Sequence, residues 1–254
     1  MKPAKEQRLE LIEQMVHQEM KVTVLALAKQ LKLTPETIRK DLKDLEAMKR
    51  VTRFHGGAQV YEPTYKEPKF NLKMNLHEVE KREIAQTAAS RITSGDTIYI
   101  DVGTTTVHMA NFIQGENIKV ITNSLAAANA FSRALEKHQF SGEVICVGGI
   151  VNTEQQSLVG TLTMEWLRHF HVQKAFISCG GVTQQAVYDY DMNEAALSHV
   201  MLERSDQAIL LVDHTKLKKK SFAKIGALNC FHEIISTGES PWEEWQSIWT
   251  KVGH

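Results

Sequence analysis

The sequence contains little of what would place it among membrane, secreted or metal-binding proteins. Its 254 residues include three cysteines, Cys146, Cys179 and Cys230, which lie far apart and form no CxxC pair. Isolated cysteines in odd number argue against a disulfide framework or a cysteine metal site and are typical of a reducing cytosol. The longest apolar runs, such as residues 208–212, have about five residues, far fewer than the ~20 that cross a bilayer. The first residues are charged, unlike a signal peptide, so we expect a soluble cytoplasmic protein without a membrane partner.

Motifs for catalysis and for cofactors are also missing. The chain has no Walker GKS/T loop, no GxGxxG, no HExxH and no GxSxG elbow, which argues against nucleotide, dinucleotide, zinc-protease and serine-hydrolase chemistry. The eleven histidines are scattered, and the one close pair, His169 and His171, has the spacing of a strand face. We expect a structural role for that pair. The sequence therefore predicts no catalytic residue, no bound metal and no cofactor.

What the sequence does contain is an uneven distribution of charge. The 30 basic and 30 acidic residues cancel over the whole chain. Residues 1–58, however, hold 12 lysines and arginines against 8 acidic residues, a net charge of +4, which leaves −4 for the remainder. A basic end on an acidic body is typical of a protein that binds a polyanion at one end.

The basic end has the pattern of a helix-turn-helix. Apolar spacing predicts a first helix over 6–18, and Thr23 can cap a short second helix over 24–30. After a tight turn, the Thr-Pro-Glu of residues 34–36 supplies a capping hydroxyl, a first-turn proline and an acid that begin a third helix. Two helices so joined, over about 23–47, the second with a basic outer face, describe an element whose second helix enters the major groove of DNA.

A glycine pair flanked by β-prone residues follows the third helix and predicts a hairpin over about 50–60. Such a hairpin can act as a wing that lies along the DNA backbone or in the minor groove. The alternative is a solvated helix and an ordinary hairpin, but the turn, the caps and the wing together favour DNA binding. The residues expected to contact DNA lie on the third helix or the wing and are Thr34, Glu36, Thr37, Arg39, Lys40, Lys43, Arg53, His55, Gly56 and Gly57.

The same residues form a long motif. It consists of Thr37-Ile38-Arg39-Lys40-Asp41-Leu42, then Leu45-Glu46, then Arg53-Phe54-His55-Gly56-Gly57-Ala58. This motif resembles the winged helix-turn-helix of the DeoR family of bacterial transcriptional regulators. Lys40 stands where a second arginine is common, which keeps the charge and loses the planar fork of hydrogen-bond donors. The resemblance implies a DNA-binding domain over residues 1–60 whose partner is a double-stranded operator.

The remainder of the chain predicts a linker and a larger domain. Residues 61–75 contain two prolines and alternating charge, which indicates an exposed linker. In the second domain, 76–254, helical patterns alternate with expected strands at 97–100, 119–122, 143–147, 174–178, 207–212 and 232–236. This alternation predicts an α/β fold with a mostly parallel sheet covered on both faces. A final helix with Trp242, Trp245 and Trp249 on one stripe is expected to pack on the body or to form a subunit interface.

Polar and glycine-containing segments follow the predicted strands, at the edge where open α/β sheets bind ligands. The segment 101–106, Asp-Val-Gly-Thr-Thr-Thr, precedes a helix and predicts a small anion site with phosphate as its guest. Turns and helix caps explain each segment singly, whereas their convergence favours a binding site. The candidate ligand-binding residues are Asp101, Gly103, Thr104, Thr105, Thr106, Asn123, Gly149, Asp213 and Lys216.

This domain also resembles the effector domain of the DeoR family, over roughly residues 75–237. The matching segments include 82–85, 101–105, 174–177 and 213–216. That effector domain is similar in fold to ribose-5-phosphate isomerase and senses phosphorylated sugars. The resemblance implies that Thr104, Thr105 and Thr106 hold a phosphate, that Asp101, Asn123 and Asp213 meet sugar hydroxyls, and that Lys216 meets the phosphate or a ring oxygen.

Taken together, these features predict a sequence-specific transcriptional regulator, a repressor of a carbohydrate-utilisation operon that a phosphorylated sugar modulates. A homo-oligomer, dimer or tetramer, is expected because one winged head reads too few base pairs for specificity. One alternative is a sugar-phosphate isomerase or deaminase, with Asp101 or Asp213 as the base and Lys216 as its electrostatic partner. Another is a constitutive DNA-binding protein whose body only oligomerises.

Overall fold

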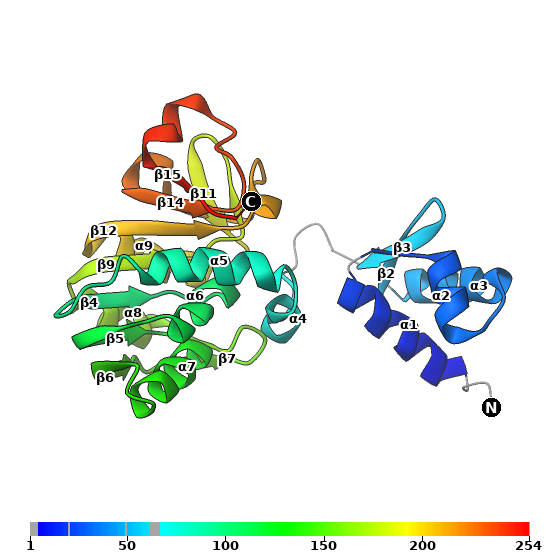
Figure 1. The fold of residues 1–254 in the computed structure, drawn as a ribbon, viewed down its shortest axis with the longest axis horizontal. Helices are drawn as coiled ribbons and strands as arrows, with labels where there is room; N and C mark the ends of the chain where they lie inside the picture. Colours follow the sequence, from blue (N-terminus) through cyan, green and yellow to red (C-terminus); the bar gives the residue numbers. More distant parts are fainter. Residues whose placement is uncertain (1–4, 20, 49, 61–66, 254) are drawn as a thin grey trace. The chain divides into compact units, whose positions relative to one another are not determined.

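In the computed structural model the chain forms two units, Met1–Leu76 and His77–His254, each with its own hydrophobic core (Figure 1). The structure describes residues 5–19, 21–48, 50–60 and 67–253. Residues 61–66 of the predicted linker lie outside this described part. Helix α4, Phe70–Met74, forms in the second half of the predicted linker, where the sequence predicts no helix. Among the described residues, no helix is both long and apolar enough to cross a membrane.

The N-terminal unit begins its helices where the sequence predicts them. In chain order it contains α1 (Lys5–Glu19), β1 (Lys21–Thr23), α2 (Val24–Leu31), α3 (Pro35–Ala47), β2 (Val51–Phe54), β3 (Gly57–Val60) and α4. The Thr23 hydroxyl accepts a hydrogen bond from the N–H of Ala26 at 3.1 Å, and the Thr34 hydroxyl accepts one from the N–H of Thr37 at 3.3 Å. Each cap satisfies a donor that the first helical turn leaves without an intrahelical partner.

The sheet of this unit has one strand more than the sequence predicts. Strand β1 pairs with β3, so that the wing hairpin is part of an antiparallel sheet of order β1-β3-β2. With three residues, β1 is too short to show an alternating pattern. The core beneath is built by fully buried side chains that include Ile12, Leu27, Ile38, Leu42, Leu45 and Val51.

The C-terminal unit is built on a parallel sheet of seven strands in the order β15-β14-β12-β9-β4-β5-β6. Their bounds are β4 Thr97–Ile100, β5 Gly115–Thr122, β6 Phe140–Cys146, β9 Val172–Ile177, β12 Ser205–Val212, β14 Glu233–Ser236 and β15 Trp249–Lys251. The first six of these strands in chain order, β4 to β14, overlap the six strands that the sequence predicts. The predicted fold class, a mostly parallel α/β sheet after an N-terminal winged helix-turn-helix, is confirmed.

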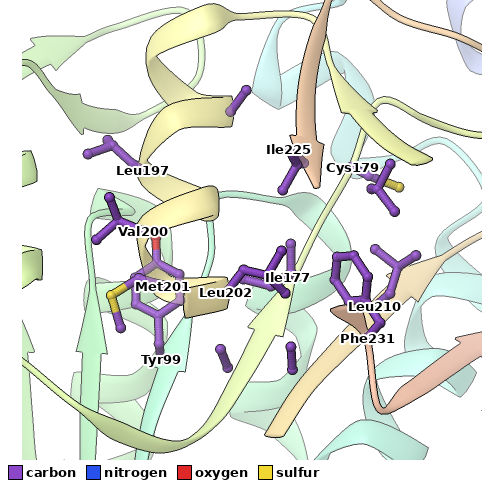
Figure 2. Packing of buried hydrophobic residues seen from close by; sticks show 14 of the residues in the cluster. Tyr99, Ile177, Cys179, Leu197, Val200, Met201, Leu202, Leu210, Ile225 and Phe231 are labelled. Carbon is purple, nitrogen blue, oxygen red and sulfur yellow. The ribbon is translucent and has the colours of Figure 1, made fainter. Parts of the chain in front are cut away.

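Helices cover both faces of this sheet (Figure 1). One core includes side chains of α5 (Glu78–Ala89) and α7 (Leu125–Glu136), such as Ile84 and Phe131. The other core includes side chains of α8 (Thr161–Arg168) and α9 (Met192–Glu203), and Figure 2 shows Leu197, Val200 and Met201 of α9 packed against it. Burial on both faces explains why the central strands read as continuous apolar runs.

Two antiparallel additions and the C-terminus differ from the sequence prediction. The additions are a hairpin of β7 (Ile150–Asn152) and β8 (Ser157–Val159), and a small sheet of β10 (Gly181–Val182), β11 (Ala186–Asp189) and β13 (Ala223–Ala227). The predicted C-terminal helix with three tryptophans on one stripe is wrong. A 3₁₀ helix, Glu243–Ile248, leads into β15, which pairs with β14, so strand pairing at the sheet edge prevailed over helical spacing. The three tryptophans pack against the core of their own unit.

Candidate nucleic-acid interface and ligand site

The outer face of α3 presents the side chains that the sequence assigns to DNA. Thr34, Glu36, Arg39, Lys40 and Lys43 are exposed, and Thr37 is half-buried. The guanidinium of Arg39 donates to Glu36 one turn earlier at 2.9 Å, and both side chains remain largely open to solvent. Because an exposed ion pair of this kind is weak, Arg39 can exchange Glu36 for a base edge or a phosphate.

The two glycines of the wing hairpin, Gly56 and Gly57, are required for different structural reasons. Gly56 has φ +95°, a conformation that L side chains rarely adopt, and it lies exposed at the tip beside His55. Gly57 is buried, and a Cβ there would lie 2.2 Å from the backbone oxygen of Val22 in β1. Packing against β1 therefore requires a glycine at position 57. Arg53, His55 and Gly56 are exposed at the wing surface, where they can contact DNA.

Replacing Arg39 with alanine is expected to weaken binding to a specific duplex by about 1–3 kcal/mol, the range for losing one base-reading arginine. The duplex is obtained by enrichment from a random pool, and affinity is measured by gel shift at stated salt. Arg39→Lys is the matched comparison: it restores affinity if Arg39 meets a phosphate, and it fails to restore affinity if the planar fork reads guanine. Unchanged affinity in Arg39→Ala would show that α3 is not the reading helix.

In the second unit, a buried hydrogen-bond network joins the carboxyl ends of the central strands. The Tyr99 hydroxyl donates to Asn123 Oδ1 at 2.7 Å and lies 3.2 Å from Asp101 Oδ1. Asp101 Oδ2 accepts from the backbone N–H of Ser178 at 3.1 Å and from the Ser198 hydroxyl at 2.9 Å. Burial raises the pKa of Asp101 to about 6, although these hydrogen bonds oppose the shift. The network ties the ends of β4, β5 and β9 to α9.

The three threonines after Asp101 have different surroundings. They begin α6 (Thr104–His108), a single turn that follows Gly103. The Thr106 hydroxyl lies 2.8 Å from the carbonyl oxygens of both Asp101 and Gly103 and therefore braces the turn. A Cβ at Gly103 would lie 2.4 Å from Ser178 Oγ, so only glycine fits there. Thr104 and Thr105 are buried beside this turn and are the hydroxyls that we assign to an anionic ligand below.

A second group of charges lies at the end of β12. Lys216 donates to the carbonyl oxygen of Cys179 at 2.6 Å, next to Ser178 on the β9 end. Asp213 is 2% exposed. Burial by itself would raise the pKa of Asp213, but the charge of Lys216, the hydrogen bonds from Thr215 and the charge of Lys81 together outweigh burial and lower this pKa. Likewise burial disfavours the charged form of Lys216, but Asp213, with further contributions that include Asp189, outweighs burial and raises the pKa of Lys216.

Lys81 acts on the candidate ligand residue Asp213, and the sequence analysis does not single it out. It is 4% exposed on α5, where its charge lowers the pKa of Asp213. The signal was present: Lys81 stands at helical spacing from the buried Ile84, Ala85 and Ala88 and is thus a lysine on the apolar face of a helix. Tyr99, Ser178 and Ser198 were also missed, because nothing in their local sequence distinguishes them from ordinary core or loop residues.

The loop that carries Asp213 and Lys216 is held against the start of α5. Glu80 Oε2 lies 2.8 Å from His214 Nδ1 and accepts from the Thr237 hydroxyl at 3.2 Å, and Glu80 Oε1 lies 3.4 Å from His77 Nδ1. These contacts position the loop next to the helix that supplies Lys81.

The structure therefore brings most of the predicted ligand residues to one edge of the sheet, in two groups that meet at the end of β9. Gly149 belongs to neither group. It follows β6, at the far end of the sheet order from β12, and a Cβ there would lie 1.9 Å from the Thr163 hydroxyl of α8. Close packing against α8 is sufficient to explain this glycine.

A winged-helix unit joined to an α/β unit with a charged, largely buried strand edge defines a transcription factor with its own sensor domain. The chain belongs to the DeoR family: residues 8–64 match the DeoR-like helix-turn-helix domain and residues 76–237 match the DeoR C terminal sensor domain. The predicted family and the predicted DNA-binding transcriptional regulator are thus confirmed.

Relatives of similar length support this assignment. The chain is 41% identical over 211 residues to an HTH-type transcriptional regulator of Staphylococcus epidermidis, covering 83% of each chain. It is 32% identical over 235 residues to the lactose phosphotransferase system repressor of Streptococcus mutans, covering 91% of this chain and 92% of that one. Among solved structures, a D-ribose-5-phosphate isomerase aligns with 15% identity and a TM-score of 0.39, over 55% of this chain and 54% of that one.

Proposed function

We propose that this chain is a repressor of a carbohydrate-utilisation operon and that a phosphorylated sugar, bound at the strand edge of the second unit, modulates its affinity for the operator. The observation that supports this most is the presence of two lysines, buried Lys81 and half-buried Lys216, around the buried Asp213 at the carboxyl end of β12. Ammonium groups donate charge-assisted hydrogen bonds to phosphate oxygens, and ligands of open α/β sheets bind at the carboxyl ends of the strands. The Streptococcus mutans relative, a phosphotransferase system repressor, supports the same class of ligand.

In this proposal different residues bind the phosphate and the sugar of the ligand. Thr104, Thr105 and the backbone of the α6 turn, together with Lys216 and Lys81, hold the phosphate. Asp213 and Asn123 meet sugar hydroxyls. The Asp101 carboxylate accepts hydrogen bonds from three donors in the core, Tyr99, Ser178 and Ser198, and serves to shape the site, which is why we assign the chain no turnover. The regulator acts as a homo-oligomer in the cytoplasm.

The test is a thermal-unfolding screen of the full chain against glucose 6-phosphate, fructose 1-phosphate, fructose 6-phosphate, galactose 6-phosphate and glycerol 3-phosphate, each beside its unphosphorylated parent. A ligand at ~100 times its dissociation constant adds about 2.7 kcal/mol of stability. Tryptophan fluorescence reports on the second unit, because all four tryptophans lie there. We expect a shift with one phosphorylated compound and none with its parent.

Variants locate the binding. Lys216→Met and Thr105→Ala are expected to abolish the shift, whereas Lys219→Met, which removes an exposed lysine from the same loop, is expected to keep it. The active compound should then change operator affinity about 5–150-fold in a gel shift, the range of a coupling of ~1–3 kcal/mol. A shift that survives in Lys216→Met, or silence across the panel, would contradict the proposed site. Turnover of a hit compound would instead support the isomerase alternative.

A further inference from the structure

One face of helix α9 lies in the chain's own core, where Leu197, Val200 and Met201 are buried, and Figure 2 shows Met201 beside Tyr99. The other face opens into a groove of about 770 Å³ between α9 and β13. This face is mixed, because Met192 and Ala196 are apolar whereas His199 and Glu203 are polar and exposed. Large apolar side chains gathered on the surface of a domain mark an interaction site, so a partner that covers this groove would remove apolar surface from water.

The groove has a floor of small residues and large apolar side chains at its border. The floor includes Ala195, Ala196, Gly226 and Ala227. At the border, Met192 is 65% exposed and Phe222 is 68% exposed. Because small residues leave a hollow and Phe222 projects beside it, the same surface carries both a knob and a hole.

The neighbouring helix α8 extends this apolar surface. Its Leu162 is 71% exposed and its Trp166 is 55% exposed, and α8 packs directly beside α9. Covering Leu162, Trp166, Met192 and Phe222 would remove roughly 500 Å² from water, because a large side chain offers about 150–250 Å² when fully exposed and about two thirds of that area is exposed here. That is well over half of the about 800 Å² that each partner contributes to a standard interface.

We infer that this face, formed by α8, α9 and β13, is the surface through which two copies of the chain associate around a two-fold axis. A two-fold contact sets one surface against itself and so requires a patch that is complementary to itself. The knob and the hole meet this requirement, with Phe222 of each copy entering the floor of the other groove. The groove border also carries both signs of charge, Glu203 and Lys224, which can pair across the axis.

The inference rests on the proposed function, because a repressor that reads two operator half-sites needs paired DNA-binding heads. The inference adds which surface of the second unit brings the two DNA-binding heads together. The tryptophans near the C-terminus, which the sequence offered as an alternative interface, are already packed on their own unit: Trp245 donates to the carbonyl oxygen of Gln184 at 3.0 Å and Trp249 to that of Gly238 at 2.8 Å.

The first experiment measures the mass of the full chain by sedimentation velocity over a range of micromolar concentrations. Phe222→Glu is expected to weaken self-association about 30-fold or more, the loss typical of an aromatic anchor at the centre of an interface. Val79→Glu is the matched control, since Val79 is an apolar side chain that is 72% exposed on α5, which covers the other face of the sheet. It should leave the mass unchanged, and urea unfolding should show that both variants are folded.

The second experiment reverses the border charges. Glu203→Lys and Lys224→Glu are each expected to weaken association, and the double variant is expected to restore it, because the exchanged charges then pair again across the axis. A merely structural role of either residue would not produce this rescue. The inference is overturned if Phe222→Glu keeps the wild-type mass, if Val79→Glu dissociates equally, or if the double variant fails to recover.

Operator binding and the thermal shift with phosphorylated sugar are measured on the same samples. A wild-type monomer that binds operator and ligand overturns the interface and the expected homo-oligomer, and leaves the proposed repressor activity and its phosphorylated ligand intact. A wild-type oligomer that dissociates in Phe222→Glu but binds neither operator nor phosphorylated sugar supports the interface and overturns the proposed function.

Discussion

Replacing Asp41 with alanine is expected to lower the free energy of unfolding of the N-terminal unit by about 3 kcal/mol. Asp41 lies on the inner face of α3 and is 1% exposed. Both of its oxygens accept hydrogen bonds from Arg8 of α1, at 2.6 and 2.9 Å. Truncation leaves a largely buried guanidinium without its partner, and the cost falls at the lower end of the range for buried pairs because Arg8 is still 16% exposed.

The measurement is urea unfolding of the full chain followed by two signals. Far-UV circular dichroism reports on both units, whereas tryptophan fluorescence reports on the second unit alone, because the first unit contains no tryptophan. Asp41→Ala should therefore move an early transition in circular dichroism and leave the fluorescence transition in place. Since α3 holds the side chains that are predicted to contact DNA, operator affinity should fall in parallel as the temperature approaches that transition.

A matched control lies on the same two helices. Lys5 of α1 and Asp44 of α3 form an ion pair at 2.8 Å whose lysine is 57% exposed. Asp44→Ala is expected to change stability far less than Asp41→Ala, because solvent screens an exposed pair. If the two variants lose the same free energy of unfolding, the bidentate geometry and the burial of the Arg8–Asp41 pair do not add to stability.

The second large effect concerns pH and Asp101, the buried carboxyl beside the proposed ligand site. The pKa of Asp101 is raised from 3.8 to about 6 by burial, so the folded chain binds this proton more tightly than the unfolded chain does. The contribution of Asp101 to stability is therefore most favourable below pH 4 and declines as the pH rises through 6. A difference of about two pKa units corresponds to roughly 3 kcal/mol lost by pH 7.

Asp101→Asn should remove this pH dependence. The amide oxygen can accept from the Ser178 N–H and the Ser198 hydroxyl, while the amide nitrogen donates to the Tyr99 oxygen. We expect the variant to match the wild type near pH 4 and to exceed its stability by roughly 3 kcal/mol at pH 7. Urea unfolding followed by tryptophan fluorescence at intervals between these values measures the difference.

The control is Glu116→Gln, the same change of acid to amide at an exposed position in β5. It should leave the pH profile of the wild type unaltered. If the difference in stability between the wild type and Asp101→Asn does not change with pH, Asp101 stays ionised in the folded chain. The hydrogen bonds to its carboxylate would then outweigh burial.

Much of the molecule could be predicted because its signals are local. Thr23 and Thr34 begin their helices as the caps predict, and β4 has the bounds 97–100 that its apolar run indicates. The motif of α3 and the wing led to the DeoR family, which the comparisons confirm. Each of these signals involves residues within a few positions of one another, so the sequence displays it directly.

Other elements have no local signal strong enough to be read. Strand β1 exists because β3 pairs with it, and β15 exists because β14 does, against the helical spacing of its tryptophans. Gly57 and Gly149 are both predicted to contact a ligand or DNA, and the structure adds that close approach of a backbone or side chain from a distant segment constrains each of them. In all four cases the partner decides the structure, and pairing with it is a tertiary event.

The sequence by itself determined the helices of the helix-turn-helix, six strands of the parallel sheet and the residue types at the ends of those strands, because periodicity, caps and motifs depend on neighbouring residues. Only the tertiary structure decided which of those residues share a site and in which electrostatic state. Asp101 is joined to Ser178 and Ser198, which are 77 and 97 residues further along the chain, and Lys81 reaches Asp213 from another helix. Burial and charge act through space, so such partners are set by packing and not by sequence spacing.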